Sequence, residues 1–441
     1  TANPTLDRQH GRPVIVFLDG EYWGIHDLRE RFDEGYIDNH YGLGELEYVQ
    51  VEIDRDVGGN PNVPVYDSGN RAWGADYSNL WAYVKNHDLT VATNYAVVQD
   101  WMDLDNFADF FQAHIFVGNS DWPGNNIRAW RSIAQVRDEG APHGLDGRWR
   151  YMIYDMDFAF GLDYSYVPGN KNFDIYKKNF GLVDQFNMLA YVQNAEQDGA
   201  TWANEPDATV MYRKLMANPE FRQHFMLRFS DQLNTSYSRA WATSQWARVS
   251  ATIQPELAEH VARWRQPTNW AQHGERIEYF AQQRPAAVWT HLQDVLKLDW
   301  RVPVTVEASD EQGLVRINTI ELSDQTPGFA GYPWTGTYFT NYPVTLTAVA
   351  KPGYEFVEWQ AALATDVVIA ADSANNYTRW NNGNNRGYGF GAWTLSKSGN
   401  SGYFLDQGGQ WGLWANNGGR AEIERPLSTA LGVGQTIGFR M

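Results

Sequence analysis

Side chains of mostly apolar type recur with helical spacing in residues 105–116. They fall at i, i+3, i+4, i+7 and i+8, which places them on one face of a helix. These positions are Phe107, Phe110, Phe111, His114 and Ile115. Asp103 or Asp105 is the expected N-cap, because a carboxylate there accepts hydrogen bonds from free backbone amides. We therefore predict a buried helix that leads directly into a polar loop.

Helical spacing also dominates the chain between this loop and residue 300. Shorter helices are predicted for residues 183–195 and 207–216, and another begins at Pro219. Two long helical patterns cover residues 239–265 and 273–298. The predicted core positions of the second are Ile277, Phe280, Ala281, Val288, Leu292, Val295 and Leu296. We interpret this helical bundle as structural core without a direct functional role.

Strands are expected on both sides of the polar loop. Residues 126–131 predict a short strand, and residues 148–154 alternate with a period of two and end at Asp155. An earlier strand at residues 13–18 continues into a hairpin turn at Asp19-Gly20. Arg148 and Arg150 either face phosphate or form cross-strand charge pairs on a solvent-exposed face of the sheet.

The pattern changes near Pro303 to short strands separated by Gly and Pro turns. Strands are predicted within residues 303–308, 314–322 and 342–359. From residue 377 onward the chain is rich in Asn, Gly and aromatic residues, and we expect a β-sandwich there. Its aromatic side chains either fill a small β core or stack on sugars.

Composition narrows the range of partners. The 441 residues predict about two to four domains with ample core. A net charge of −18 argues against nucleic acid, an anionic membrane or a highly acidic substrate. No apolar run approaches the roughly 18 residues that span a bilayer. The absence of cysteine excludes disulfides and thiolate metal sites, and no signal peptide is visible.

The candidate catalytic and metal-binding residues lie in the polar loop and directly after the predicted strand at residues 148–154. Residues 119–126 read NSDWPGNN, which places Asp121 and Asn126 in the spacing Asp-x-x-x-x-Asn. Residues 154–161 read YDMDFAFG, which places Asp155 at a strand end ahead of Phe-Gly. Protein kinases present a catalytic Asp, a metal-binding Asn and a metal-binding Asp in this order.

The Asp121 loop and the Asp155 segment can each also be explained by local structure without catalysis. Asn, Gly and Pro around Asp121 are favourable turn residues, so Asp121 alone fits an ordinary loop. Asp155 and Asp157 fit a solvated strand end or a helix cap. Their surroundings are aromatic and apolar, however, where a charge is costly unless it is paired or metal-bound.

Three motifs together resemble the CotH kinase family, which is known from spore-coat proteins and common in secreted bacterial proteins. They are FLDGEYWGIHDLRE at residues 17–30, GNSDWPGNNIRAWR at residues 118–131 and GRWRYMIYDMDFAFG at residues 147–161. The resemblance covers roughly residues 11–298. It implies an atypical protein-kinase-like fold and phosphorylation of protein substrates with a Mg-nucleotide.

The resemblance also assigns roles to individual residues. Asp121 matches the catalytic Asp that orients the acceptor hydroxyl and accepts its proton. Asn126 and Asp155 match the metal-binding positions, and Asp157 shares the ion. These oxygen ligands suit Mg²⁺ or Mn²⁺ bound with ATP. Glu30 ends the first motif and is placed near the nucleotide cleft.

The chain departs from a complete kinase at its N-terminal end. A kinase cradles the phosphates with a Gly-rich loop and a Lys or Arg on a strand. No Gly-rich loop precedes residues 13–18, and no strand of this N-terminal part carries a Lys, since Lys85 is the first lysine. Because the chain starts at Thr1 without Met, we expect an N-terminal lobe that is incomplete.

The predicted fold is α+β and protein-kinase-like, with a mostly helical C-terminal lobe and all-β accessory modules. The domains are expected at residues 1–300 (kinase-like), 301–371 (β repeat module) and 372–441 (β-sandwich-like). Residues 344–359 resemble the internalin-type B repeat, a small β spacer of secreted and surface proteins. Their alternative interpretation is a simple hairpin.

Two functions therefore follow from the sequence. The first is a secreted or cell-surface kinase that phosphorylates Ser or Thr of an unidentified protein. The second is a non-catalytic surface protein that binds a polysaccharide or another cell-surface component and uses a kinase-like scaffold. A dinuclear-metal hydrolase is a weaker third, since no His accompanies the carboxylates at ligand spacing.

Overall fold

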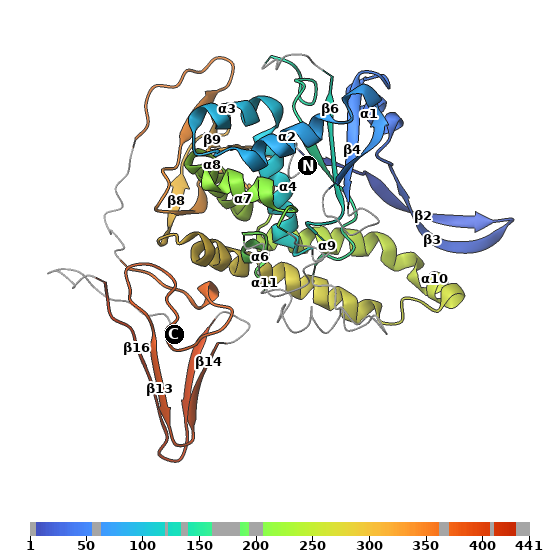
Figure 1. Ribbon diagram of the computed structural model, residues 1–441. Helices are drawn as coiled ribbons and strands as arrows, with labels where there is room; N and C mark the ends of the chain where they lie inside the picture. The colour runs from blue at the N-terminus through green and yellow to red at the C-terminus, as the bar shows by residue number, and fades with distance from the viewer. Residues whose placement is uncertain are drawn as a thin grey trace. The chain divides into compact units, whose positions relative to one another are not determined.

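The computed structural model describes residues 6–54, 63–119, 122–133, 140–160, 186–193, 206–360, 370–405 and 410–428. The chain forms two compact units, Thr1–Pro285 with Asp324–Phe329, and Ala286–Ser323 with Ala330–Met441. Helices and several small sheets alternate along the chain (Figure 1), which confirms a mixed α+β class. The predicted limits of three domains stay a prediction.

The first unit contains a five-stranded sheet in the order β1-β7-β6-β4-β5. Its strands are β1 (Asp7–Arg8), β4 (Tyr48–Asp54), β5 (Val63–Gly69), β6 (Ile127–Ser132) and β7 (Arg150–Ile153). Strands β6 and β7 are antiparallel, with Arg128 opposite Met152. The start of β6 and the end of β7 therefore lie at the same edge of the sheet.

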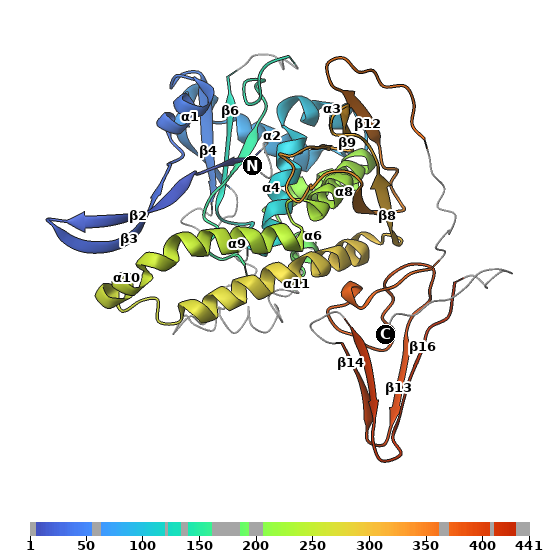
Figure 2. The ribbon, with the colours of Figure 1, turned by 180° about the vertical axis from the view of Figure 1, so that it is seen from behind.

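A separate hairpin forms from β2 (Gly11–Leu18) and β3 (Glu21–Arg29). Asp19 and Gly20 both have positive φ, 52° and 87°, as a two-residue type I′ turn requires. This confirms the predicted turn. The hairpin lies against α10 (Leu257–Trp264) (Figure 2). The Trp264 indole donates to the Trp23 carbonyl at 2.6 Å.

Helix α4 (Leu104–Val117) is the predicted buried helix and forms the centre of the first unit. Asp103 is its N-cap and accepts from the amides of Asp105 and Asn106, which resolves the choice between Asp103 and Asp105. All of its residues except Asp105 are buried. Gly118 ends the helix in the left-handed conformation with φ 64°.

The described residues form eight further helices. They are α1 (Glu34–Tyr41), α2 (Asp76–Asn86), α3 (Ala92–Trp101), α6 (Met188–Gln193), α7 (Val210–Ala217), α8 (Pro219–Asn234), α9 (Arg239–Ile253) and α11 (Trp270–Leu296). Short 3₁₀ turns lie at Arg71–Trp73, Gln254–Glu256 and Ala374–Asn376. In the described part of the chain, no helix combines the length and apolar character needed to cross a membrane.

The helical predictions were correct in type and less accurate in their limits. The long pattern at residues 239–265 is divided into α9 and α10 by a 3₁₀ turn that holds Pro255, because proline cannot donate the helical hydrogen bond. Helix α7 begins at Val210 rather than at residue 207. In α11, Ile277 and Val295 are only half-buried, whereas the other predicted core positions are buried.

The prediction that Arg148 and Arg150 lie on a solvent face or bind phosphate was wrong for Arg150. Its side chain is 1% exposed and pairs with Asp146 at 2.7 Å and Asp103 at 2.9 Å. Arg148 also pairs with Asp146, at 2.6 Å. Consecutive residues of β7, Arg150, Tyr151 and Met152, are all buried, so both faces of the strand are covered. A cation buried there needs carboxylate partners.

After α11, the described residues of the second unit form mainly short strands in small sheets. Its strands are β8 (Arg301–Val306), β9 (Gly313–Ile317), β10 (Ile320–Leu322), β11 (Trp334–Phe339), β12 (Leu346–Ala350), β13 (Thr394–Ser398), β14 (Ser401–Leu405), β15 (Trp411–Ala415) and β16 (Arg420–Glu424). They pair as β10-β9-β12, β11-β8, β13-β16 and β14-β15. An aromatic cluster around Tyr377, Trp380 and Leu395 packs beside these last strands.

The predicted strand region at residues 342–359 was too long. Only β12 (Leu346–Ala350) forms, and residues 351–360 contain no strand. Tyr354 and Trp359 are exposed there, and Val357 is 81% exposed. Alternating side chains alone do not make a strand, because each strand also needs a neighbour for its backbone hydrogen bonds. The B-repeat and β-sandwich modules remain predictions.

Candidate functional site

The loop after α4 is fixed on both sides of the predicted catalytic Asp121. Before it, the buried Asn119 amide lies 3.2 Å from Nδ1 of His114. After it, the Trp122 side chain is fully buried and stacks on the His114 ring, with centroids 4.5 Å apart. Asp121 itself lies outside the described residues, so its catalytic role stays a prediction.

Asn126 and Asp155 lie at one edge of the central sheet. Asn126 immediately precedes β6, and Asp155 follows β7 by two positions. The antiparallel register, with Ala129 opposite Tyr151, brings these two strand ends level. Both residues adopt left-handed backbone, with φ 60° for Asn126 and 52° for Asp155. Asn and Asp tolerate this conformation better than most residues, so the chain can turn sharply on either side of the edge.

Asp155 and Asp157 form a pair of neighbouring carboxyl groups on the surface. Partial burial raises the pKa of Asp155, and its hydrogen bond to Asp157 and the charge of Asp157 raise that pKa further. Two carboxylates this close repel each other when both are ionised. A proton or a bound cation relieves the repulsion, and hard oxygen ligands favour Mg²⁺ or Ca²⁺ over softer metals.

Sequence reasoning missed Arg29, the last residue of β3. The positive charge of Arg29 acts on Asp155 and opposes the rise in its pKa. Its guanidinium also pairs with Asp27 at 3.1 Å. Arg29 therefore meets the expectation of a Lys or Arg on a strand, although no lysine precedes Lys85. The available signal was its place in the first motif, directly before Glu30.

A polar network supports the two strand ends behind this edge. Glu52 on β4 lies opposite Arg128 in the sheet register and accepts from Nη2 of Arg128 at 3.0 Å. Its second oxygen accepts from the Tyr154 hydroxyl at 2.9 Å. Arg128 lies two residues after Asn126, and Tyr154 lies directly before Asp155. One carboxylate therefore connects the segments that carry both predicted ligands.

Glu30 is bound by two histidines. Its carboxylate accepts from the His10 backbone amide at 2.9 Å and lies 2.9 Å from His10 Nδ1 and 3.0 Å from His40 Nε2. Partial burial disfavours the ionised form, but these hydrogen bonds prevail and lower the pKa of Glu30 to about 2. Glu30 is therefore ionised at neutral pH. Its contact with a nucleotide stays a prediction.

A separate pocket lies elsewhere in the described residues. It measures about 610 Å³ and is lined by residues around the N-terminal end of α4, including Asp103, His143, Arg148 and His224. The loop that contains Asp121 follows the opposite end of the same helix. None of the predicted site residues lines this pocket, so it is separate from the carboxylate edge.

Comparison with known proteins supports the family resemblance that the three motifs indicate. The sequence model described as CotH kinase protein matches residues 3–288, which is more than half of the chain. No curated protein matches the chain. The family predicted from the motifs is thereby confirmed.

Proposed function

Because the chain belongs to the CotH kinase protein family, we propose that it transfers the terminal phosphoryl group of ATP to a Ser or Thr hydroxyl of a protein. The family indicates a kinase-like fold. The observation that carries the proposal is the register of β6 with β7, which brings the strand start after Asn126 level with the strand end before Asp155, where Asp157 is hydrogen-bonded to Asp155. This edge follows the anchored loop in which Asp121 lies, as the order of kinase motifs requires.

The side chains at this edge fit a nucleotide-bound Mg²⁺ or Mn²⁺. Asp155 and Asp157 are close enough to share a hydrogen bond, and a hard cation would relieve their mutual repulsion. Asn126 would add an amide oxygen from the adjoining strand. When bound, the Mg-nucleotide supplies the phosphoryl group and neutralises phosphate charge. The residues of this chain position the reactants around it.

Three further roles complete the proposal. Asp121 would orient the acceptor hydroxyl and receive its proton. Arg29 would present a cation to phosphate oxygens beside the carboxylates, a task that kinases give to a strand lysine. Glu52 would act indirectly, since it holds the segments that carry Asn126 and Asp155. A secreted or cell-surface location agrees with the bacterial proteins that the motifs resemble.

Calorimetric titration with Mg-ATP and Mn-ATP tests this function. We expect saturable, metal-dependent binding by the parent chain and loss of binding in Asp155→Asn. The matched control is Asp38→Asn, the same change at an exposed position of α1. No binding by the parent chain, or unchanged binding in Asp155→Asn, would contradict the proposal. Where binding is found, transfer of labelled phosphate to candidate protein acceptors follows.

Polysaccharide binding by the second unit is the alternative function. Phe404 and Trp414 are 48% and 43% exposed, and the register of β14 with β15 places them on the same face. Each ring also covers a cross-strand glycine, Gly412 and Gly402 respectively, so part of this exposure has a packing explanation. Binding of a polysaccharide panel that is lost in Trp414→Ala would favour the alternative.

A further inference from the structure

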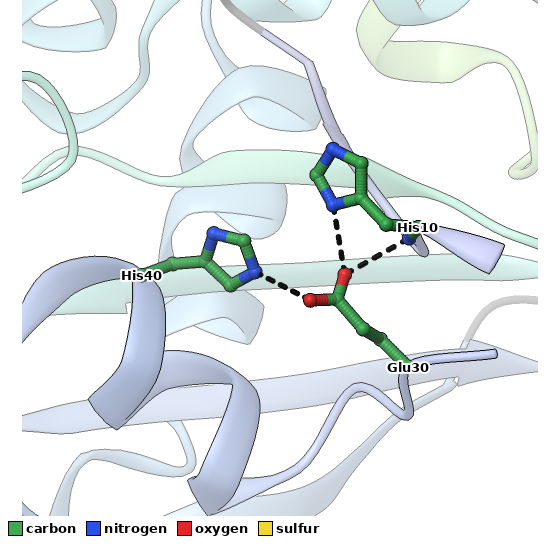
Figure 3. A group of neighbouring side chains, drawn as sticks. All are labelled: His10, Glu30 and His40. Carbon is green, nitrogen blue, oxygen red and sulfur yellow. Dashed lines mark hydrogen bonds and ion pairs between the residues drawn. The ribbon is translucent and has the colours of Figure 1, made fainter.

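We propose that His10, Glu30 and His40 form a binding site for a divalent transition-metal ion of the zinc type. This site is distinct from the proposed Mg-nucleotide site at Asp155. Figure 3 shows both imidazoles directed at the Glu30 carboxylate from different segments of the chain. Among the described residues, these three side chains form the group of at least three His or acidic residues whose ligand atoms lie close enough together to hold one ion.

The distances between the ligand atoms suit a single ion. One nitrogen of each imidazole and a Glu30 oxygen all lie within 4.8 Å of one another. The hydrogen-bonded pairs are shorter, at 2.9 Å for His10 Nδ1 and 3.0 Å for His40 Nε2. Ligands around tetrahedral zinc lie about 3.3 Å apart. Small side-chain rotations would therefore replace the present hydrogen bonds with metal bonds.

The three ligands are presented by well-anchored segments. His40 lies in the last turn of α1, which is capped by Asp33 and buries Tyr36 and Ile37. His10 and Glu30 are joined through their backbones, since the Glu30 amide donates to the His10 carbonyl at 2.9 Å. A metal ion would therefore find its ligands held at fixed positions, which lowers the entropic cost of binding.

The segment before His10 is fixed to the same helix and sheet. Asp7 on β1 accepts from the Tyr36 hydroxyl at 3.0 Å and from the Trp130 indole at 2.7 Å. The buried Trp130 side chain is on β6, and Tyr36 is on α1. His10 is thereby held within three residues of a buried anchor. Its own side chain stays accessible, with 55% of its surface exposed.

The ligand types select the class of metal. Two imidazole nitrogens and one carboxylate favour zinc and neighbouring transition metals, whereas Mg²⁺ prefers an all-oxygen shell. Three protein ligands leave a position for water, and the exposure of His10 and Glu30, 55% and 36%, provides access to it. The chain contains no cysteine, so thiolate competition for the ion does not arise.

A metal here would join the base of the β2–β3 hairpin to α1. Glu30 directly follows Arg29, the strand cation whose charge acts on Asp155. Binding would therefore fix the end of β3 beside the carboxylate edge. This structural role differs from the nucleotide contact that the sequence predicted for Glu30. The structural role requires a zinc-type ion, whereas the nucleotide contact depends on Mg²⁺ or Mn²⁺.

Zinc titration of the full, tag-free chain tests the site, because a histidine tag would itself bind zinc. Calorimetry should show one Zn²⁺ bound per chain and a higher melting temperature with Zn²⁺ than with chelator. Substitutions His10→Gln and His40→Gln should each weaken binding at least about tenfold, since even outer-shell changes cost that much. His10→Gln is the safer variant for folding because His10 is exposed.

The matched control is His26→Gln, the same change at an exposed histidine of β3. It should bind zinc like the parent chain, and so should Asp155→Asn. Equal zinc affinity in His10→Gln, His40→Gln and the parent would overturn the proposal, as would loss of zinc binding in Asp155→Asn. No zinc binding by the parent would show that the three side chains form an ion-pair clamp only.

Discussion

Arg128 lies over the ring of Tyr154, with its guanidinium carbon 4.9 Å from the ring centre. Both side chains bind the same Glu52 carboxylate, at 3.0 Å and 2.9 Å. The first predicted ligand, Asn126, lies two residues before Arg128, and the second, Asp155, directly follows Tyr154. The position of the proposed metal ligands therefore depends on a polar contact that includes neither of them.

Glu52→Gln tests this dependence. The change weakens two charge-assisted hydrogen bonds, and because Glu52 is partly exposed we expect a loss of only about 1 kcal/mol in the free energy of unfolding. Mg-ATP affinity should fall as well, since the strand ends lose their common support. Urea unfolding and calorimetry measure the two effects. Glu275→Gln on the exposed surface of α11 is the control, and equal behaviour of the two variants would contradict the proposed role.

Arg29→Gln tests the strand cation. We expect Mg-ATP to bind about tenfold more weakly, equivalent to about 1.4 kcal/mol, because a cation beside the phosphates is lost. The same change at Arg12, an exposed arginine on the partner strand β2, serves as the control. If Arg12→Gln weakens binding as much as Arg29→Gln, net charge rather than position explains the effect.

The ion pair of Asp109 with Arg228 predicts a large effect on stability. Asp109 is fully buried on α4, and Arg228 on α8 donates to it at 2.6 Å through Nη2. Asp109→Ala should lower the free energy of unfolding by about 3–5 kcal/mol, because it leaves a buried charge without its main partner. Asp105→Ala, four residues earlier on the same helix, should cost far less because Asp105 is 50% exposed. Urea denaturation distinguishes the two, and similar losses would refute this interpretation.

His114 predicts the pH dependence of folding. Burial lowers the pKa of His114 to about 3, so the folded protein keeps this imidazole neutral. In the unfolded chain it is protonated below about pH 6.5. Stability should therefore be independent of this group above pH 6.5 and fall by up to about 1.4 kcal/mol per pH unit as the pH decreases toward 3.

Chemical unfolding at pH 7 and pH 5 measures this change. The decrease should be smaller in His114→Gln, which cannot take up the proton, than in the parent chain. His273→Gln, at an exposed position of α11, controls for the loss of a histidine as such. Equal pH dependence in His114→Gln and the parent would show that other groups cause the acid destabilisation.

Local sequence signals determined the elements that carry the site. The helical period and the Asp103 cap predicted α4, and Asp19-Gly20 predicted the hairpin turn, because these features depend on neighbouring residues alone. The three motifs were sufficient to identify the family, whose sequence model matches residues 3–288. The strand prediction within residues 342–359 extended beyond β12 (Leu346–Ala350), since strand formation also requires a partner elsewhere in the chain.

Tertiary structure decided which side chains meet. The register of β6 with β7 brought Asn126 level with the strand end before Asp155. Packing on both faces of β7 buried Arg150, and the fold brought Arg29 close enough for its charge to act on Asp155. His10, Glu30 and His40 converge from three segments. Such contacts join residues that are distant in sequence, whereas hydrophobic periodicity describes only the face of one element. The sequence by itself therefore determined the helices, turns and motifs. The tertiary structure determined which of their side chains act together.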